Sequence, residues 1–344
     1  MAPLTRSRAI GNIPGNNMVE YYRQRSGAGL IITEGVSPSP NGLGYPRMPG
    51  IFSQQQIEGW RKVTRAVHEN DGRIFMQLMH TGRVSHIANL PEGAEVVAPS
   101  VVPLAGKMHV DAQGSKDFTV PREMTIEDIE FVKAEYVIGA QNAIEAGFDG
   151  VELHGANGYL LEQFLSPVTN TRNDQYGGSI EARISFVLET VAQVAEIIGK
   201  DKVGIRLSPY GTASGMLHYP EIEATYTKLA QALNKIGIAY IHLVDHGSIG
   251  GGIVPDSLKK TIRSSFSRTL ILSGGYNYER AENDLQNSAA NLIAFGRPFI
   301  SNPDLALRLQ NDWPLADADS TKFYTPGDEG YIDYPVYEEE LAMA

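Results

Sequence analysis

The stretch GVELHGANGY, from Gly150 to Tyr159, carries the pattern that decides the fold. Its first four residues form a short, mostly apolar run with the composition of a buried β-strand. A histidine, an asparagine and a tyrosine follow within the next six residues. In barrels of parallel strands the active site lies where the strands end, so polar side chains at this point indicate a site as well as a strand.

The same pattern recurs along the chain, where short apolar runs rich in β-branched residues alternate with stretches of helical periodicity. The further predicted strands are residues 29–33, 73–78, 202–207, 240–244, 269–272 and 291–295. The predicted helices are Gln54–Glu69, Thr125–Ala146, Ser179–Ile198, Ile222–Ile236 and Arg280–Asn287. Thr125 and Asp128 have the spacing of a capping box. Apolar strands that alternate with helices predict an α/β protein whose parallel sheet is covered on its faces.

Two architectures fit this alternation. One is a (β/α)8 TIM barrel with Met1–Leu4 as its eighth strand, and the other is an open doubly wound sheet. No G-x-G-x-x-G follows the first strands. Polar residues stand at the carboxyl ends of nearly all the strands: Glu34, Gln77, His154, Arg206, Asp245 and Ser273. Both observations favour the barrel.

The stretch from residue 90 to residue 122 interrupts the alternation, because it is rich in proline and glycine and has little helical period. It follows the third strand of the predicted barrel, so we expect it to form a lid over the site. The ending, residues 323–337, is a second candidate covering segment. Because the chain has no linker and no repeat beyond the strand–helix unit, residues 1–344 are predicted to form one domain.

Composition excludes several functional classes. The 344 residues carry a net charge of −11 and include no cysteine. An acidic chain is a poor candidate for binding nucleic acid, and a chain without cysteine has no disulfides, thiolate metal ligands or cysteine nucleophiles. No apolar run reaches the about 18–20 residues of a membrane helix, and no secretory signal is recognisable. We expect a cytoplasmic protein that does not associate with membranes.

Glycines end two consecutive predicted strands. Gly274 and Gly275 follow one strand, and Gly296 with Arg297 follows the next. Barrels often hold phosphate at this place through backbone N–H groups, and an arginine adds a charged fork for phosphate oxygens. The alternative is that these glycines serve only tight turns with positive φ. The coincidence on consecutive strands favours a phosphate site.

Polar residues from different strands are predicted to surround the centre of the barrel. They are Thr5, Gln77, His154, Asn157 and Arg206. Such a ring fits a flat heterocycle with donors and acceptors on its edge. A buried arginine needs an anionic partner or a strong acceptor. The alternative for Arg206 is an ion pair inside the barrel with Glu34 or Glu152.

His154 and Asn157 can point the same way if a helix begins near Asn157. Two donors that converge on a carbonyl oxygen stabilise negative charge there, by about 3 kcal/mol each. Tyr159 would then supply a proton, a role worth about 10²–10⁴-fold in rate. The alternative is a helix N-terminus capped by Asn157, with Tyr159 packed in the core. No second histidine or carboxylate has zinc spacing, so we expect no metal.

Together these motifs resemble the Old Yellow Enzyme family of flavin-dependent ene-reductases. The matching stretches are residues 1–6, 77–78, 80–83, 154–159, 170–172, 176–179, 295–299 and 330–335, in family order over almost the whole chain. Thr5 stands where another large branch of the family has a cysteine, which indicates the classical branch. The resemblance implies a (β/α)8 barrel that binds FMN noncovalently, with NADPH or NADH as the hydride donor.

The resemblance also implies a role for each candidate residue. The residues implied to bind the flavin ring are Pro3, Thr5, Gly35, Gln77 and Arg206. Those implied to hold the phosphate are Gly274, Gly275, Gly296 and Arg297. His154 and Asn157 would bind the substrate oxygen, and Tyr159 would protonate the α-carbon. The residues at positions that line the substrate space are Tyr45, Phe323 and Tyr324.

The activity implied by the resemblance is reduction of the activated C=C bond of α,β-unsaturated carbonyl compounds, with enals, quinones and nitro compounds as further substrates. Family members have a longer segment before the residues that match Met1–Thr5. We therefore expect a truncated first strand that leaves the edges of its neighbours unpaired. The alternative is a flavin-binding barrel with little or no turnover. Partners are expected to be small molecules, and the protein a monomer or homodimer.

Overall fold

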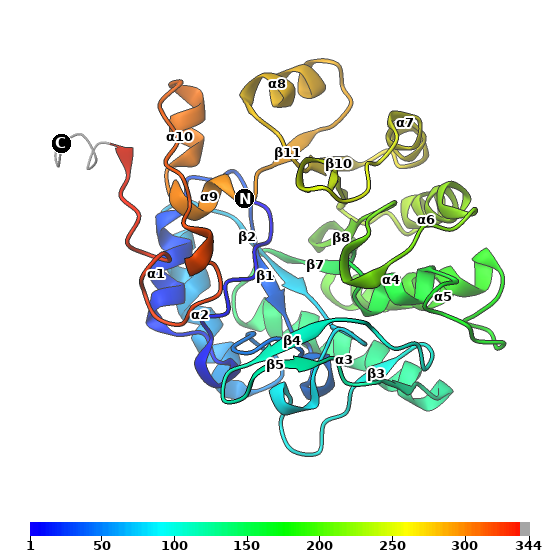
Figure 1. Cartoon of the computed structure of the whole chain (residues 1–344). Coiled ribbons are helices and arrows are strands. Elements are labelled where there is room, and N and C mark those ends of the chain that lie inside the picture. Colours follow the sequence, from blue (N-terminus) through cyan, green and yellow to red (C-terminus); the bar gives the residue numbers. More distant parts are fainter. Residues whose placement is uncertain (338–344) are drawn as a thin grey trace.

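A parallel sheet forms the centre of the structure, a computed structural model that describes residues 1–337 (Figure 1). Residues 338–344, which the predicted domain includes, lie outside this part. The strand order is β1-β2-β7-β8-β9-β10-β11. The strands are β1 (Ile31–Val36), β2 (Ile74–Leu78), β7 (Gly150–Gly155), β8 (Val203–Leu207), β9 (Tyr240–Val244), β10 (Thr269–Ser273) and β11 (Leu292–Ala294). Each matches a predicted strand, and the sheet curls into the wall of a half-barrel.

The register of the sheet brings polar residues of neighbouring strands to the same level. Gln77 of β2 lies opposite Glu152 of β7. Arg206 of β8 lies opposite His154 of β7 on one side and His242 of β9 on the other. All residues of β7, β8 and β9 are buried, because helices pack on the outer face and barrel side chains fill the inner one. The polar groups at the centre therefore come from adjacent strands.

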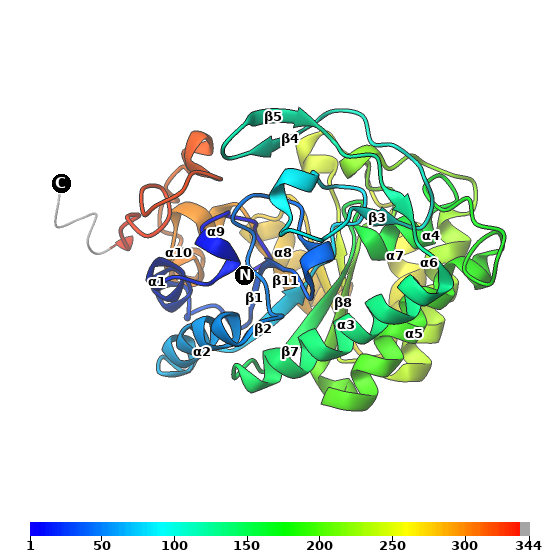
Figure 2. The same cartoon turned by 90° about the horizontal axis from the view of Figure 1, so that it is seen from below.

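Helices surround the sheet on its outside (Figures 1 and 2). They are α1 (Asn16–Gln24), α2 (Gln54–His68), α3 (Ile126–Glu145), α4 (Leu160–Leu165), α5 (Ile180–Ile198), α6 (Ile222–Ile236), α7 (Asp256–Ser265), α8 (Tyr278–Gln286), α9 (Pro298–Ser301) and α10 (Leu305–Gln310). The predicted helices are confirmed as α2, α3, α5, α6 and α8. The sequence prediction lacks the other five, of which α4, α9 and α10 have six residues or fewer, too few turns for apolar periodicity to be recognised.

The N-terminus of α3 carries the predicted capping box. The Asp128 N–H donates to Thr125 Oγ1 over 3.0 Å, and the Thr125 N–H donates to the Asp128 carboxylate over 2.7 Å. Arg122 binds the same carboxylate over 2.7 Å. The Arg122 guanidinium, assisted by Thr125, lowers the pKa of Asp128 to about 2. The cap is therefore charged at neutral pH.

We expect Asp128→Asn to lower the free energy of unfolding at pH 7 by up to about 1 kcal/mol, because the pair with Arg122 is partly exposed and screened. Folding depresses the pKa from 3.8, so this stabilisation is present above about pH 4 and is lost as the pH falls toward 2. Denaturant unfolding between pH 7 and pH 3 measures the loss. The control is Ser179→Ala, which removes the uncharged cap of α5 and should cost the same at each pH. A pH-independent effect of Asp128→Asn contradicts the prediction.

The N-terminal residues lie between the two outer strands of the sheet. The Met1 amino group donates to Leu30 O over 2.7 Å, and Met1 O accepts from the Ile32 N–H over 3.1 Å, beside β1. On the other side the Ala2 N–H donates to Phe295 O over 2.8 Å, beside β11. This segment occupies the place predicted for the eighth strand. The expectation that the neighbouring edges are left unpaired is wrong at these positions.

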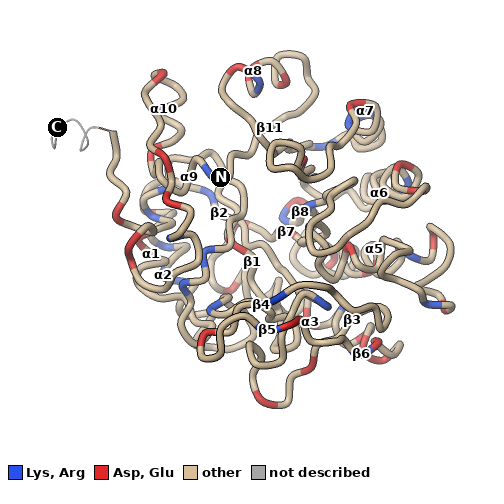
Figure 3. The backbone as a smooth tube through the Cα atoms, in the orientation of Figure 1, with Lys and Arg blue, Asp and Glu red and all other residues tan. Residues whose placement is uncertain are grey.

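The stretch between β2 and α3 contains two small sheets. β3 (Val97–Ala98) pairs with β6 (Arg122–Glu123), and β4 (Lys107–Val110) forms a hairpin with β5 (Gly114–Asp117). Figure 2 shows the β4–β5 hairpin at one end of the sheet, outside the ring of helices. Acidic and basic residues are interspersed along the chain (Figure 3). Within residues 1–337, no helix is both long and apolar enough to cross a membrane.

Candidate active site

Three adjoining cavities lie at the carboxyl ends of the strands. The inner cavity, of about 180 Å³, is lined by residues that include Pro3, Thr5, Gln77, His154, Asn157, Tyr159, Arg206, Phe323 and Tyr324. The glycine cavity, of about 390 Å³, has Gly274, Gly275 and Gly296 in its wall. It shares Asn157, Arg206 and Arg297 with the inner cavity. The outer cavity, of about 1070 Å³, shares Thr5, Tyr159 and Tyr324 with the inner one. The three cavities therefore share parts of their walls and lie side by side.

Arg206 supplies an unpaired donor to the inner cavity. Its side chain is buried, and its Nε–H has no hydrogen-bond partner among residues 1–337. Burial lowers the pKa of Arg206, and the charge of Glu152 opposes that shift. Leaving a buried donor unsatisfied is costly. An acceptor or an anion bound in the cavity would satisfy it.

The ion-pair alternative for Arg206 does not describe the structure, because both candidate carboxylates have other partners. Glu152 accepts from Gln77 Nε2 over 2.8 Å and lies 2.9 Å from His242 Nδ1. Burial alone would raise the pKa of Glu152, but His242 and the Arg206 charge outweigh it and lower the pKa. Glu34 is hydrogen-bonded to α1 instead. Glu152 therefore anchors Gln77 and compensates the Arg206 charge from a distance.

The end of β7 carries His154, and the turn that follows carries Asn157, into the wall of the inner cavity. Asn157 and Gly158 have φ of +61° and +78°, and α4 begins only at Leu160. The alternative in which Asn157 caps the helix is therefore wrong, and no helix begins at Asn157. His154 Nδ1 and Asn157 Oδ1 are buried without a partner in the described chain. Burial, and then the Arg206 charge, lower the pKa of His154 well below its usual range, so the imidazole is neutral.

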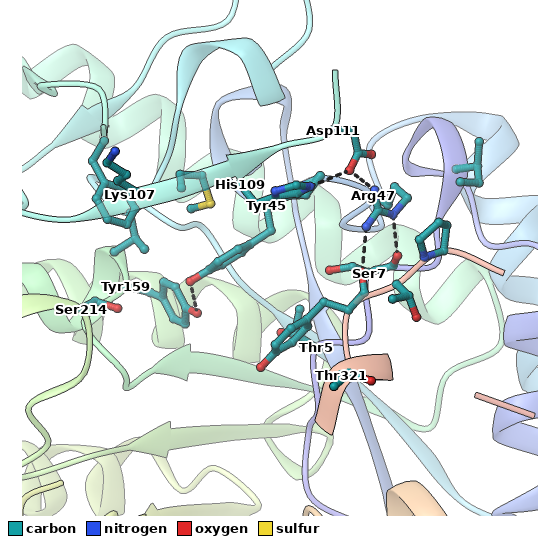
Figure 4. Close-up of a pocket in the computed structure, with 18 residues that line it drawn as sticks. Thr5, Ser7, Tyr45, Arg47, Lys107, His109, Asp111, Tyr159, Ser214 and Thr321 are labelled. Atoms are coloured by element: carbon teal, nitrogen blue, oxygen red, sulfur yellow. Dashed lines mark hydrogen bonds and ion pairs between the residues drawn. The ribbon is translucent and has the colours of Figure 1, made fainter. Parts of the chain in front are cut away.

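Tyr159 stands where the inner and outer cavities meet. Its hydroxyl lies 2.9 Å from the Tyr45 hydroxyl, and Figure 4 shows the two side chains pointing toward one another. The Tyr159 ring packs edge-on against His154 with 5.0 Å between the centroids. Burial, and then Tyr45, raise the pKa of Tyr159 well above its usual range. The ring is buried, as the packing alternative requires, but the residue also lines the cavity and keeps its proton.

The wall of the glycine cavity needs glycine at two positions. Gly274 and Gly275 have φ of +114° and +64°. A side chain on Gly274 would overlap the carbonyl oxygen of Asp245, and one on Gly275 would crowd Ser248. Gly296 lacks the positive φ that the tight-turn alternative requires. Gly274 and Gly275 therefore form tight turns, as that alternative requires. The same turns place backbone without side chains in the wall of a cavity that Arg297 also lines.

The outer cavity is lined by segments far apart in the sequence. Its wall includes Tyr45, Tyr324 and the hairpin residue Lys107. Arg47 connects three of these segments, since its guanidinium binds Ser7 O over 2.9 Å, Tyr324 O over 2.8 Å and the carboxylate of Asp111 (Figure 4).

One predicted residue lies outside the linings of all three cavities. Gly35 sits in β1 opposite Gln77, where an added side chain would meet Met79. Sequence reasoning missed Arg47 and His246, which line the outer and glycine cavities. His246 directly follows Asp245, the polar residue just after β9, so its position at a strand end could have identified it. No sequence pattern indicated Arg47, because it lies in a loop far from any predicted strand end.

The donors and the shape of the site fit FMN. The inner cavity offers the unpaired Nε–H of Arg206, together with Thr5 and Gln77, for the edge of a flat ring. The adjoining glycine cavity offers backbone free of side chains, and Arg297, for a phosphate. The two cavities meet at Arg206, as a ring and its phosphate-bearing tail require.

This combination of fold and site defines a flavin-dependent oxidoreductase. Residues 1–316 match the NADH:flavin oxidoreductase / NADH oxidase family, and the chain belongs to that family. It is 41% identical to a putative 12-oxophytodienoate reductase 11 of Oryza sativa subsp. japonica, over 99% of this chain and 94% of that protein. The predicted membership in the Old Yellow Enzyme family is thereby confirmed, with FMN as the cofactor and a nicotinamide as the hydride donor.

Solved structures agree with this assignment. Morphinone reductase superposes with a TM-score of 0.95 at 42% identity, over 99% of this chain and 92% of that one. The Old Yellow Enzyme homologue from Zymomonas mobilis superposes with a TM-score of 0.94 at 39% identity, over 98% and 94%. Morphinone reductase in complex with tetrahydroNAD gives 0.93 at 42%, over 98% and 92%.

Proposed function

We propose that this NAD(P)H-dependent flavin oxidoreductase reduces the activated C=C bond of α,β-unsaturated carbonyl compounds. The observation that carries the proposal is the juxtaposition of His154, Asn157 and Tyr159 around one cavity. The first two have buried polar atoms without partners, and the third holds a proton. Relatives named as reductases of 12-oxophytodienoate and morphinone support this substrate class.

The cofactor is held by residues of two cavities in this proposal. Pro3, Thr5, Gly35, Gln77 and Arg206 surround the flavin ring, with Gly35 acting from β1 through its backbone. Gly274, Gly275, Gly296 and Arg297 hold the phosphate. Bound FMN would offer acceptors on the edge of its ring to the unpaired Nε–H of Arg206, and the Arg206 charge would favour negative charge on that edge. When bound, FMN supplies the hydride that a nicotinamide has delivered to it.

The substrate is oriented by its oxygen. A neutral His154 and the Asn157 amide donate hydrogen bonds to the carbonyl oxygen, where negative charge develops as hydride reaches the β-carbon. Each such donor is worth about 3 kcal/mol when preorganised. Tyr159 gives its proton to the α-carbon, and its high pKa ensures that the proton is present over the neutral range.

The substrate's remaining atoms occupy the outer cavity, whose wall includes Tyr45 and Tyr324, with Phe323 lining the inner cavity beside it. Its volume of about 1070 Å³ admits cyclic enones, enals, quinones and nitro compounds. Residues 90–122 act as the lid, since Lys107 and Asp111 stand in the cavity wall. The hydrogen bonds of Met1 and Ala2 to both neighbouring edges support turnover over the low-turnover alternative.

The test of the proposal is a titration of the purified protein. The protein with FMN should be yellow, lose its colour anaerobically with NADPH or NADH, and recover it on addition of cyclohexenone. A colourless protein that takes up no FMN defeats the assignment. A protein that is reduced by nicotinamide but is reoxidised only by oxygen defeats the substrate class alone.

We expect His154→Ala to weaken binding of phenols, which place an oxygen where the substrate carbonyl would lie. Loss of one donor to a charged oxygen should raise the Kd of p-cresol by about 10–100-fold. The charge-transfer absorption band of the complex measures the Kd. The control is His218→Ala, since His218 is exposed and lines none of the three cavities. Equal Kd values in the two variants remove His154 from the oxygen site.

A further inference from the structure

Glu162 is a buried carboxylate that contacts the Asn157–Gly158 turn, which carries one of the two proposed substrate donors. It lies in α4, is 3% exposed, and accepts three hydrogen bonds. The Gly158 N–H donates to Oε2 over 2.6 Å. The hydroxyls of Ser208 and Tyr226 each donate to Oε1 over 2.8 Å. No ion pair within residues 1–337 involves this carboxylate, so its charge is met by neutral donors alone.

Both backbone N–H groups of the turn are connected to this carboxylate. The Asn157 N–H donates to Ser208 Oγ over 2.8 Å, and Ser208 in turn donates to Glu162. The Gly158 N–H reaches Glu162 directly. On the opposite side Gly158 O accepts from Gln163 Nε2 over 2.7 Å. The turn is therefore clamped by neighbouring residues of α4 and by Ser208, the residue that follows β8.

The clamped turn has a backbone conformation that needs support. Asn157 and Gly158 are consecutive residues with positive φ, and Asn157 is not a glycine. A non-glycine residue in this region is strained and persists when its surroundings hold it there. The conformation places the Asn157 side chain in the wall of the inner cavity. Whatever holds the two N–H groups thus also sets the direction of the Asn157 amide.

We propose that Glu162 is a positioning residue whose carboxylate holds the Asn157–Gly158 turn so that Asn157 faces the substrate oxygen. The inference rests on the proposed function. It makes the binding of the substrate oxygen depend on a carboxylate that does not contact that oxygen. A carboxylate accepts from N–H and O–H groups more strongly than a neutral acceptor does. The turn is therefore held more tightly when Glu162 is ionised than when it carries a proton.

The charge state of Glu162 changes within an accessible range of pH. Burial raises the pKa of Glu162 to about 7, although its three hydrogen bonds act to lower that pKa. The titratable groups that face it are Tyr226 and Tyr219 of neighbouring segments, whose own pKa values are raised by burial, so both stay neutral. The folded pKa exceeds the usual 4.5, so folding favours the protonated acid, and ionisation costs stability as the pH rises through 7. The tight clamp operates above pH 7.

The test compares the wild type with Glu162→Gln, which keeps the shape and removes the charge. The ratio of the two Kd values for p-cresol cancels the titration of the ligand itself. We expect the variant to bind about tenfold more weakly at pH 8.5, and within about twofold of the wild type at pH 6. A ratio that is near one at both pH values, or equally raised at both, overturns the proposal, because a purely structural role would not follow the titration.

The matched control is Glu135→Gln. Burial raises the pKa of Glu135, on α3, to about 7 as well, but the side chain that opposes this shift is Ser39, not a residue of the turn. Its Kd ratio should stay near one at both pH values, and a tenfold ratio at pH 8.5 would overturn the proposal.

A second readout needs neither FMN nor turnover. Hydrogen exchange of the peptide that contains residues 154–160, in the FMN-free protein at pH 8.5, should be about tenfold faster in Glu162→Gln. Unchanged exchange contradicts the clamp. A protein that fails to reduce enones while its exchange responds to Glu162→Gln would defeat the proposed function and keep the clamp.

Discussion

Replacing Tyr159 by phenylalanine is expected to slow enone reduction by about 10²–10⁴-fold while the reduction of the flavin by NADPH keeps its rate. The substitution removes one oxygen and its proton and keeps the ring that packs against His154. The oxygen donors His154 and Asn157 remain, so substrate binding should change little. Anaerobic stopped-flow spectroscopy, with the two half-reactions recorded separately, measures the effect.

The control for this prediction is Tyr45→Phe. It removes the hydroxyl that lies 2.9 Å from the Tyr159 hydroxyl but leaves the proton on Tyr159. Its effect on enone reduction should therefore be much smaller, about tenfold or less. If both variants are equally slow, the proton comes through the pair rather than from Tyr159 alone. If Tyr159→Phe turns over normally, Tyr159 is not the acid.

Gly274→Ala is expected to lower the free energy of unfolding by about 3 kcal/mol or more and to abolish FMN retention. The backbone has φ of +114° there, where a side chain is strained, and the added methyl group would overlap the carbonyl oxygen of Asp245. Relief requires the loops after β9 and β10 to separate, and those loops form the glycine cavity. Thermal unfolding and fluorescence of released FMN measure the two effects.

Gly250→Ala is the matched control. Gly250 also has a positive φ, +78°, in the loop after β9, but an added side chain meets nothing within 4 Å. It should therefore show only the backbone cost of about 1 kcal/mol, with FMN retained. If the two variants lose FMN equally, backbone strain alone explains the loss, and the close approach of Asp245 to Gly274 is irrelevant.

Much of the fold was predictable because it depends on local patterns. The strand at residues 240–244 and the helix at residues 222–236 have the predicted bounds, since continuous apolar runs and a 3.6-residue period are properties of neighbouring residues. The sequence placed Met1–Leu4 as the eighth strand, but it did not show that Met1 and Ala2 reach both outer strands, because that depends on the curvature that brings β1 and β11 near one another.

The site, too, was predictable from local patterns in part only. The sequence located His154, Asn157 and Tyr159 at a strand end, since their order there follows from one short motif. It left open whether Asn157 caps a helix, because the same residues can form a helix cap or an active-site turn. The positive φ of Asn157 excludes the cap, and that angle depends on contacts from Ser208, after β8, and from Glu162 of α4.

The sequence by itself thus determined which residue types stand at the strand ends, the alternation that makes a barrel wall, and the family. Only the tertiary structure decided that Arg206 keeps an unpaired donor, that Tyr45 meets Tyr159, and that Glu162 stands behind the turn. The physical reason is that burial and hydrogen bonding are properties of neighbours in space. Tyr45 and Tyr159 are 114 positions apart, and no local pattern carries the information that their hydroxyls touch.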